Sequence, residues 1–128
     1  MALSEYVTGI QHVGIPTNDM EATLVFYEAL GFRRVYHTVN GSEKICFLQL
    51  KNLCIETYEN GNAVLKVGAV DHIAIDVTDI EAAYRAVQTL GCNFLAEEIS
   101  YLPFWERGIR YFVILGPNQE KIEFCQIL

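Results

Sequence analysis

The sequence repeats itself with an offset of 60 residues, and this repeat constrains the fold more than any other feature. When residues 12–31 are laid over residues 72–91, seven of the twenty positions are identical without a gap. The identical pairs are His12/His72, Ile15/Ile75, Asp19/Asp79, Glu21/Glu81, Ala22/Ala82, Leu30/Leu90 and Gly31/Gly91. A solenoid needs about three repeats or more, so two copies predict a duplicated module that closes one shared core.

Both copies open with the signals of a strand and a helix. Residues 9–15 and 70–77 alternate like a half-buried strand, and apolar residues then recur at helical spacing. Gly31 and Gly91 stand where the residue after a helix adopts left-handed backbone. The candidate N-caps are Asn18 or Asp19 in the first copy, and Thr78 or Asp79 in the second.

Three short strands are predicted after each helix. They cover residues 32–39, 44–50 and 53–58 in the first copy, and 93–99, 110–115 and 121–127 in the second. The sequence Gly116-Pro117-Asn118 is typical of a turn with Pro117 at its second position. The predicted fold is therefore α+β, with two βαβββ modules at about residues 8–60 and 70–127. We expect them to form a single domain over residues 1–128.

The formal net charge of −7 argues against some classes of partner. An acidic surface repels phosphate backbones and anionic lipids, so we expect no nucleic acid and no membrane partner, and a cation is favoured. No apolar stretch approaches the roughly 18 residues of a membrane helix, and residues 1–10 lack the features of a secretory signal. The cysteines follow no zinc or disulfide spacing, so we expect a cytoplasmic protein with reduced thiols at Cys46, Cys54, Cys92 and Cys125.

Four polar residues recur at equivalent places in the two copies. His12 and His72 lie on the first strands, each with a glycine or an alanine two positions further on that leaves open space. Glu56 and Glu123 follow an isoleucine within apolar runs of the fourth strands. A buried carboxylate costs several kcal/mol unless it is paired or bound to a metal. The pattern predicts that all four residues are metal ligands.

The ligand set of two imidazoles and two carboxylates favours Zn, Ni, Co, Mn or Fe(II) over Ca or Mg. Without thiolates it does not resemble a closed structural zinc site, and open coordination positions would permit Lewis-acid catalysis. The alternative is that the histidines are hydrogen-bonded core residues and the glutamates face solvent. His37 has no counterpart in the second copy and is interpreted as a surface residue. Glu59 and Glu120, at strand ends, are expected to be solvated.

Several motifs resemble the vicinal oxygen chelate superfamily over essentially the whole chain. They are His12-Val13-Gly14-Ile15 through Asp19, Phe26-Tyr27, Leu30-Gly31-Phe32, and Gly116-Pro117-Asn118 leading into Lys121-Ile122-Glu123-Phe124. The resemblance implies two βαβββ units whose sheets form a cup around a divalent metal. The superfamily includes glyoxalase I, methylmalonyl-CoA epimerase, extradiol dioxygenases, fosfomycin-modifying thiol transferases and metal-free bleomycin-binding proteins.

Within this superfamily, the resemblance is strongest to glyoxalase I of the bacterial type, which takes a histidine and a glutamate from each module. The matching positions are His12, Glu56, His72 and Glu123. The resemblance implies a lyase or isomerase acting on a 2-oxo hemithioacetal or a related small carbonyl compound through a metal-bound enediolate. Glu123 and Glu56 would be catalytic, and Zn, Ni or Co would be the favoured metal, before Mn or Fe.

Other members of the superfamily remain as alternatives. Epimerases usually carry glutamine where Glu56 stands, dioxygenases and thiol transferases use only three ligands, and the metal-free binding proteins usually lose them. The alternative functions are an epimerase, a thiol transferase, a dioxygenase, or a non-catalytic binding or resistance protein.

Two positions bear on whether the substrate contains glutathione, and they point in opposite directions. Glutathione-using relatives commonly carry an arginine four residues after the first histidine, and this chain has Pro16 there. Asn60, four residues after Glu56, matches a family contact to glutathione. The resemblance therefore leaves open whether the substrate is a thiol adduct.

Residues 101–107 form an aromatic stretch that we expect to overhang the site, or to form a dimer surface. In the first case Phe104, Trp105 and Arg107 would contact substrate. Relatives often complete the metal site with module one of one subunit and module two of another, and a homodimer is expected.

Overall fold

The computed structural model describes residues 2–128. It contains β1 (Val13–Thr17), α1 (Met20–Ala29), β2 (Arg33–Asn40), β3 (Glu43–Leu50), β4 (Leu53–Glu59), β5 (His72–Asp76), α2 (Ile80–Thr89), β6 (Asn93–Phe94), β7 (Ser100–Leu102), β8 (Ile109–Leu115) and β9 (Lys121–Ile127), after a short 3-10 helix at Leu3–Glu5. The sheet of module one has the order β1-β4-β3-β2. That of module two has the order β5-β9-β8-β6, with β7 also paired to β8. The predicted α+β fold with duplicated modules is confirmed.

The helix limits follow the sequence signals. Asp19 and Asp79 are the N-caps, and each side chain accepts a hydrogen bond from the amide three residues on, at 3.1 and 3.0 Å. Gly31 and Gly91 have φ angles of +105° and +72°, a conformation that glycine adopts without a steric penalty. Neither helix within residues 2–128 is long and apolar enough to cross a membrane.

Three predicted strands differ from the structure. The first, predicted over residues 9–15, is β1 at Val13–Thr17, so His12 lies immediately before this strand and not on it. The strand predicted over residues 70–77 is shortened to His72–Asp76. The predicted strand 93–99 is divided into β6 and β7. In the intervening segment, the Leu95 amide still donates to the Val113 carbonyl of β8, and the Glu97 carbonyl accepts from the Tyr84 hydroxyl of α2.

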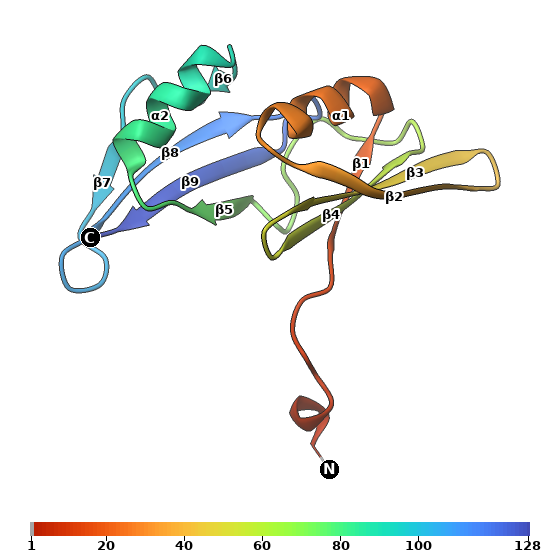
Figure 1. Cartoon of the computed structure of the whole chain (residues 1–128), viewed down its shortest axis with the longest axis horizontal. Helices are drawn as coiled ribbons and strands as arrows, with labels where there is room; N and C mark the ends of the chain where they lie inside the picture. The colour runs from red at the N-terminus through yellow and green to blue at the C-terminus, as the bar shows by residue number, and fades with distance from the viewer. Residues whose placement is uncertain (1) are drawn as a thin grey trace.

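The two modules lie side by side, with α1 and α2 on the same side of their sheets (Figure 1). The apolar core fills the space between helices and sheets, and one continuous cluster includes residues of both modules. Its largest fully buried members are Tyr27, Phe112, Leu48, Ile55, Ile80, Ile114 and Ile122. At the far edge of module one, β2 is exposed throughout and carries a register shift between Arg34 and Tyr36. His37, on this strand, is exposed as predicted.

Asn118, in the last turn of module two, is inserted into module one. Its side chain is only 8% exposed. The Oδ1 atom accepts hydrogen bonds from the Thr17 hydroxyl at 3.2 Å and from the Asn18 amide at 3.3 Å. The Nδ2 atom donates to the Thr23 hydroxyl at 3.0 Å. Buried polar groups are stable only when they are hydrogen-bonded, so this network fixes the turn against the start of α1.

A second contact joins the modules beside it. The buried hydroxyl of Tyr27 donates to Oε2 of Glu120 at 2.8 Å, and the other carboxylate oxygen accepts from the Asn118 amide at 2.8 Å. A Cβ atom at Gly116 would overlap the Glu120 side chain, so the glycine leaves room for it. We call these contacts of Asn118 and Glu120 with module one the inter-module seam.

The prediction that Glu59 and Glu120 are solvated strand-end residues is wrong. Glu120 belongs to the seam, and Oε2 of Glu59 accepts from the Met20 amide at 2.6 Å. That amide is at the N-terminus of α1, where backbone N–H groups lack partners in the helix and favour an anion.

The seam predicts how stability depends on pH. Burial, and next the nearby Glu120 carboxylate, raise the pKa of Tyr27 well above its usual value. In the unfolded chain, tyrosine ionises near pH 10, so the stabilisation is complete below that pH and is lost as the pH rises further. Tyr27→Phe should lower the free energy of unfolding by about 1.5–3 kcal/mol at neutral pH. Urea denaturation of both proteins should show this difference shrinking above about pH 10; a constant difference would contradict the assignment.

Candidate metal centre

Each module brings its own histidine and glutamate together. β1 pairs with β4 and β5 pairs with β9, in both cases in parallel. In module one, Nε2 of His12 lies 3.4 Å from Oε1 of Glu56. In module two, Nε2 of His72 lies 3.5 Å from Oε1 of Glu123. The duplication has therefore preserved the same histidine–glutamate pair in both modules. We call each pair, His12 with Glu56 and His72 with Glu123, a half-site.

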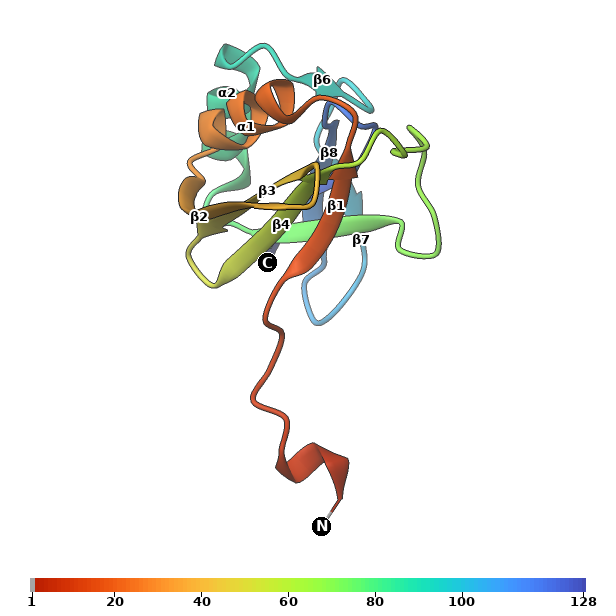
Figure 2. The same ribbon diagram turned by 90° about the vertical axis from the view of Figure 1, so that its right-hand side faces the viewer.

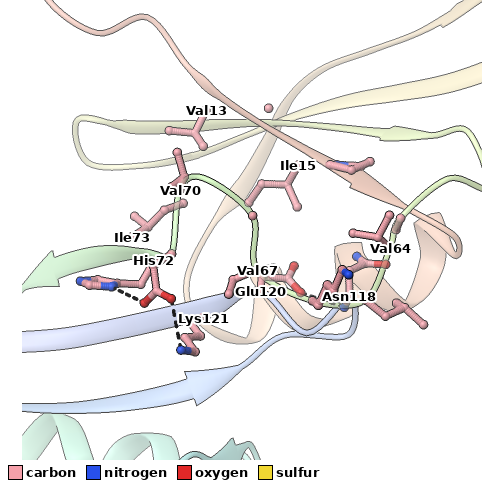
Figure 3. Close-up of a pocket in the computed structure, with 17 residues that line it drawn as sticks. Val13, Ile15, Val64, Val67, Val70, His72, Ile73, Asn118, Glu120 and Lys121 are labelled. Carbon is pink, nitrogen blue, oxygen red and sulfur yellow. Dashed lines mark hydrogen bonds and ion pairs between the residues drawn. The ribbon is translucent and has the colours of Figure 1, made fainter.

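A hydrogen-bond acceptor precedes each histidine. Oε1 of Gln11 contacts Nδ1 of His12, and Oδ2 of Asp71 lies 2.9 Å from Nδ1 of His72. Such acceptors favour a proton on Nδ1, which leaves the lone pair of Nε2 facing the glutamate. Asp71 also accepts from Nζ of Lys121 at 3.3 Å (Figure 3). The hydrogen bond to His72, and next the one to Lys121, lower the pKa of Asp71. The signal that we missed is an acceptor side chain immediately before both histidines.

The donor atoms fit a shared divalent ion. Separations of 3.4 and 3.5 Å are too long for a good hydrogen bond between the partners. They are close to the roughly 3.0–3.4 Å that separates two ligand atoms each about 2.0–2.2 Å from one zinc ion. At Gly14, an added Cβ would lie 3.9 Å from Oε1 of Glu56 and 3.4 Å from the Tyr58 ring. The missing side chain thus leaves space beside the carboxylate.

The two half-sites do not meet within one chain. In residues 2–128, no three histidine, cysteine, aspartate or glutamate side chains gather in a way that could hold a metal ion. Each half-site contains two candidate ligands, and the four-ligand centre stays a prediction.

A cavity of about 400 Å³ adjoins the half-site of module two. Its wall is formed by Asp71, His72, Leu95, Leu102, Phe104, Trp105, Ile109, Tyr111, Val113, Lys121 and Glu123. Of the four predicted substrate contacts, Phe104 and Trp105 therefore lie beside the half-site. Arg107 is outside this wall, and the Asn60 side chain accepts from the amide of Asn62 in its own loop. The wall is mainly apolar and aromatic.

A second cavity, of about 310 Å³, lies between β1 and the segment that joins the modules (Figure 3). Val13 and Ile15 face Val64, Val67 and Val70 across it. His72, Asp71 and Lys121 border both cavities, so the half-site of module two separates them.

Two buried cysteines lie beside the candidate ligands. Cys54 and Cys125 are each two residues from a glutamate, on the same face of the strand. Burial, and next the charge of the neighbouring glutamate, raise the pKa of both thiols. The candidate donor set of His12, Glu56, His72 and Glu123 consists of nitrogen and oxygen atoms.

The fold is that of the vicinal oxygen chelate class. Residues 9–124 match the Glyoxalase/Bleomycin resistance protein/Dioxygenase superfamily, and the chain belongs to this family. It is 38% identical over 125 residues to the uncharacterized protein YwbC of Bacillus subtilis (strain 168), covering 91% of this chain and 96% of that one.

Solved structures share the fold at low sequence identity. A glyoxalase family protein from Enterococcus faecalis is 20% identical with a TM-score of 0.79, over 94% of this chain and 98% of that chain. The fosfomycin resistance protein FosX from Listeria monocytogenes, complexed with Mn(II) and sulfate, is 15% identical with a TM-score of 0.74, over 95% and 94%. These similarities establish the architecture, and the chemistry must be argued from the site itself.

The contact between Asp71 and His72 predicts a role in metal affinity. Groups that orient a metal-binding histidine typically contribute about 10–100-fold to affinity. Asp71→Ala should weaken the binding of Zn(II) to the full chain by about that factor, measured by competition with a chromophoric chelator. Glu98→Ala, an exposed residue with the same change in charge, is the control. Equal affinities of the two variants would show that Asp71 does not orient the ligand.

Proposed function

We propose that this protein is a metal-dependent lyase or isomerase of the glyoxalase I type that acts as a homodimer on a 2-oxo hemithioacetal or a related small carbonyl compound. The observation that carries the proposal is the pair of matched half-sites, with N···O separations of 3.4 and 3.5 Å. His12 and Glu56 of one protomer, with His72 and Glu123 of its partner, would hold one divalent ion. Zn, Ni and Co are the favoured ions, and the Mn(II) in FosX adds Mn to the series that should be tested.

A bound divalent ion would act as a Lewis acid that polarises the substrate carbonyl and acidifies the adjacent C–H. Glu123 would receive that proton and return it to the neighbouring carbon. Its side chain is 15% exposed, against 25% for Glu56, and it borders the cavity that also contains Phe104 and Trp105. The apolar wall would exclude water during the transfer. Glu56 is the second candidate base.

The two histidines would remain neutral ligands. In each, Nδ1 lies against an acceptor, Gln11 or Asp71, and Nε2 is directed toward the glutamate of its module. This division of roles leaves proton transfer to the carboxylates.

The residues at the site do not select glutathione as the thiol of the substrate. Pro16 offers no positive charge to a carboxylate, and the side-chain oxygen of Asn60 already accepts a hydrogen bond within its own loop. We therefore expect the activity to depend less on glutathione than in relatives with an arginine at this position.

A shared centre predicts that two inactive variants complement one another. His12→Ala and His72→Ala should each abolish tight metal binding. In a heterodimer of the two, one site loses both histidines and the other is intact. Random mixing after reversible dissociation should thus restore about a quarter of the wild-type sites, measured as bound metal per chain. A centre built within each chain would show no recovery.

The substitution Glu123→Gln tests whether the Glu123 carboxylate is the base that accepts the substrate proton. Glutamine keeps the volume and one oxygen donor but cannot accept a proton, so kcat should fall by about 10²–10⁴-fold. The assay uses methylglyoxal with several thiols, including glutathione, and the metal content is measured on the same sample. His37→Ala, on the exposed β2, should change neither quantity.

The outcomes of this assay separate the alternatives. A fully metallated and equally active Glu123→Gln variant would make Glu123 only a ligand and direct the search for the base to Glu56. A metallated wild type without turnover on any thiol would refute glyoxalase activity. An epimerase or another reaction of the superfamily would then be tested.

A further inference from the structure

The chain begins with an apolar arm that its own protomer leaves uncovered. This N-terminal arm, residues 2–11, extends away from both modules (Figures 1 and 2). Every one of its residues is exposed, and Ile10 is 77% exposed. Its other large apolar side chains are Leu3, Tyr6 and Val7. Within the described residues, its hydrogen bonds join only residues 2–12 to one another.

A second uncovered apolar surface forms the rim of the cavity beside the half-site of module two. Trp105 is 66% exposed, and Leu95 and Phe104 are also more than half exposed. Trp105 has a φ of +57°, a conformation that bulky residues rarely adopt. The Tyr101 hydroxyl fastens its loop by donating to the carbonyl of Arg107 at 3.3 Å. The loop therefore holds an aromatic side chain outward in a defined position.

The arm continues directly into His12, which is a ligand of the proposed shared centre, so that centre would bring the arm near the rim of a second copy. In extended backbone, residues two apart lie on the same side and about 7 Å from one another. In the proposed shared centre, His12 would reach the ion at the half-site of module two of the second copy, and Ile10 would then lie close to that module. The cavity there is lined by His72 and Glu123 together with Phe104 and Trp105.

The charge distribution agrees with contact between two copies. The chain carries −7, so two copies repel each other over most of their surfaces. Glu5 is the only acidic residue of the arm, which contains no lysine or arginine. The arm thus brings a single charged side chain to a contact between two copies, and its other large side chains are apolar or aromatic.

We propose that the N-terminal arm of one protomer lies across the rim formed by Leu95, Phe104 and Trp105 of a second copy and supplies the missing wall of its cavity. This inference rests on the shared metal centre of the proposed function. It adds that the substrate pocket is enclosed by an apolar segment from the other chain, which selects for substrates with an apolar group beside the carbonyl.

Trp105 is the only tryptophan in the chain and reports on this contact directly. The arm variant is Val7→Ser with Ile10→Ser. The matched control is Val25→Ser with Val39→Ser, two exposed residues on α1 and β2. In the full-length dimer, the arm variant should shift the emission of Trp105 to longer wavelength and increase its quenching by acrylamide, while the control should match the wild type.

Mixed dimers test whether the arm acts on the other chain. A Trp105→Phe chain with an intact arm contributes no tryptophan signal. Mixed with the arm variant, it should return the emission and quenching of the remaining Trp105 toward wild-type values. No recovery, or an arm variant that matches the control, would overturn the proposal.

Metal binding, Trp105 fluorescence and sedimentation together separate a failure of this inference from a failure of the proposed function. A dimer that restores metal binding on mixing His12→Ala with His72→Ala, but whose Trp105 is insensitive to the arm, keeps the shared centre and refutes the arm contact. A wild type that sediments as a monomer at micromolar concentration refutes both.

Discussion

The insertion of Asn118 into module one is the interaction on which the arrangement of the molecule depends. Each sheet is built from strands of its own module, so the relative position of the two half-sites is set where the modules touch. At that place, one amide side chain bonds Thr17, Asn18 and Thr23. Directional bonds among buried groups define a single orientation more sharply than apolar packing alone.

The seam and the proposed metal centre have opposite requirements. The seam is at least partly buried and hydrogen-bonded, whereas the histidines of the two half-sites have side chains 37% and 44% exposed. The orientation that satisfies Asn118 and Tyr27 keeps His12 and His72 in separate half-sites. Under the proposed function, a second chain would then have to supply the complementary half-site.

Much of the fold could be predicted because its signals are local. Asp19 and Gly31 mark the helix in the sequence as they do in the structure, since capping depends on neighbours within a few residues. The pairing of His12 with Glu56 was also predictable, because the repeat shows both residues twice. Asn118 was predicted only as a turn residue, since its burial depends on a segment 100 residues away. Glu59 and Glu120 were misjudged for the same reason.

The exposed strand β2 has a consequence for how copies of this chain can meet. An open edge strand of eight residues presents unpaired backbone groups that invite another strand to continue the sheet. The shift in register between Arg34 and Tyr36 interrupts that row, and Arg34 is held by Glu28 at 2.9 Å beside it. Growth of the sheet from one molecule to the next, which leads to fibrils, is thereby disfavoured. The closed pair of the proposed function would leave this edge free, and the interrupted edge would not extend it into a longer assembly.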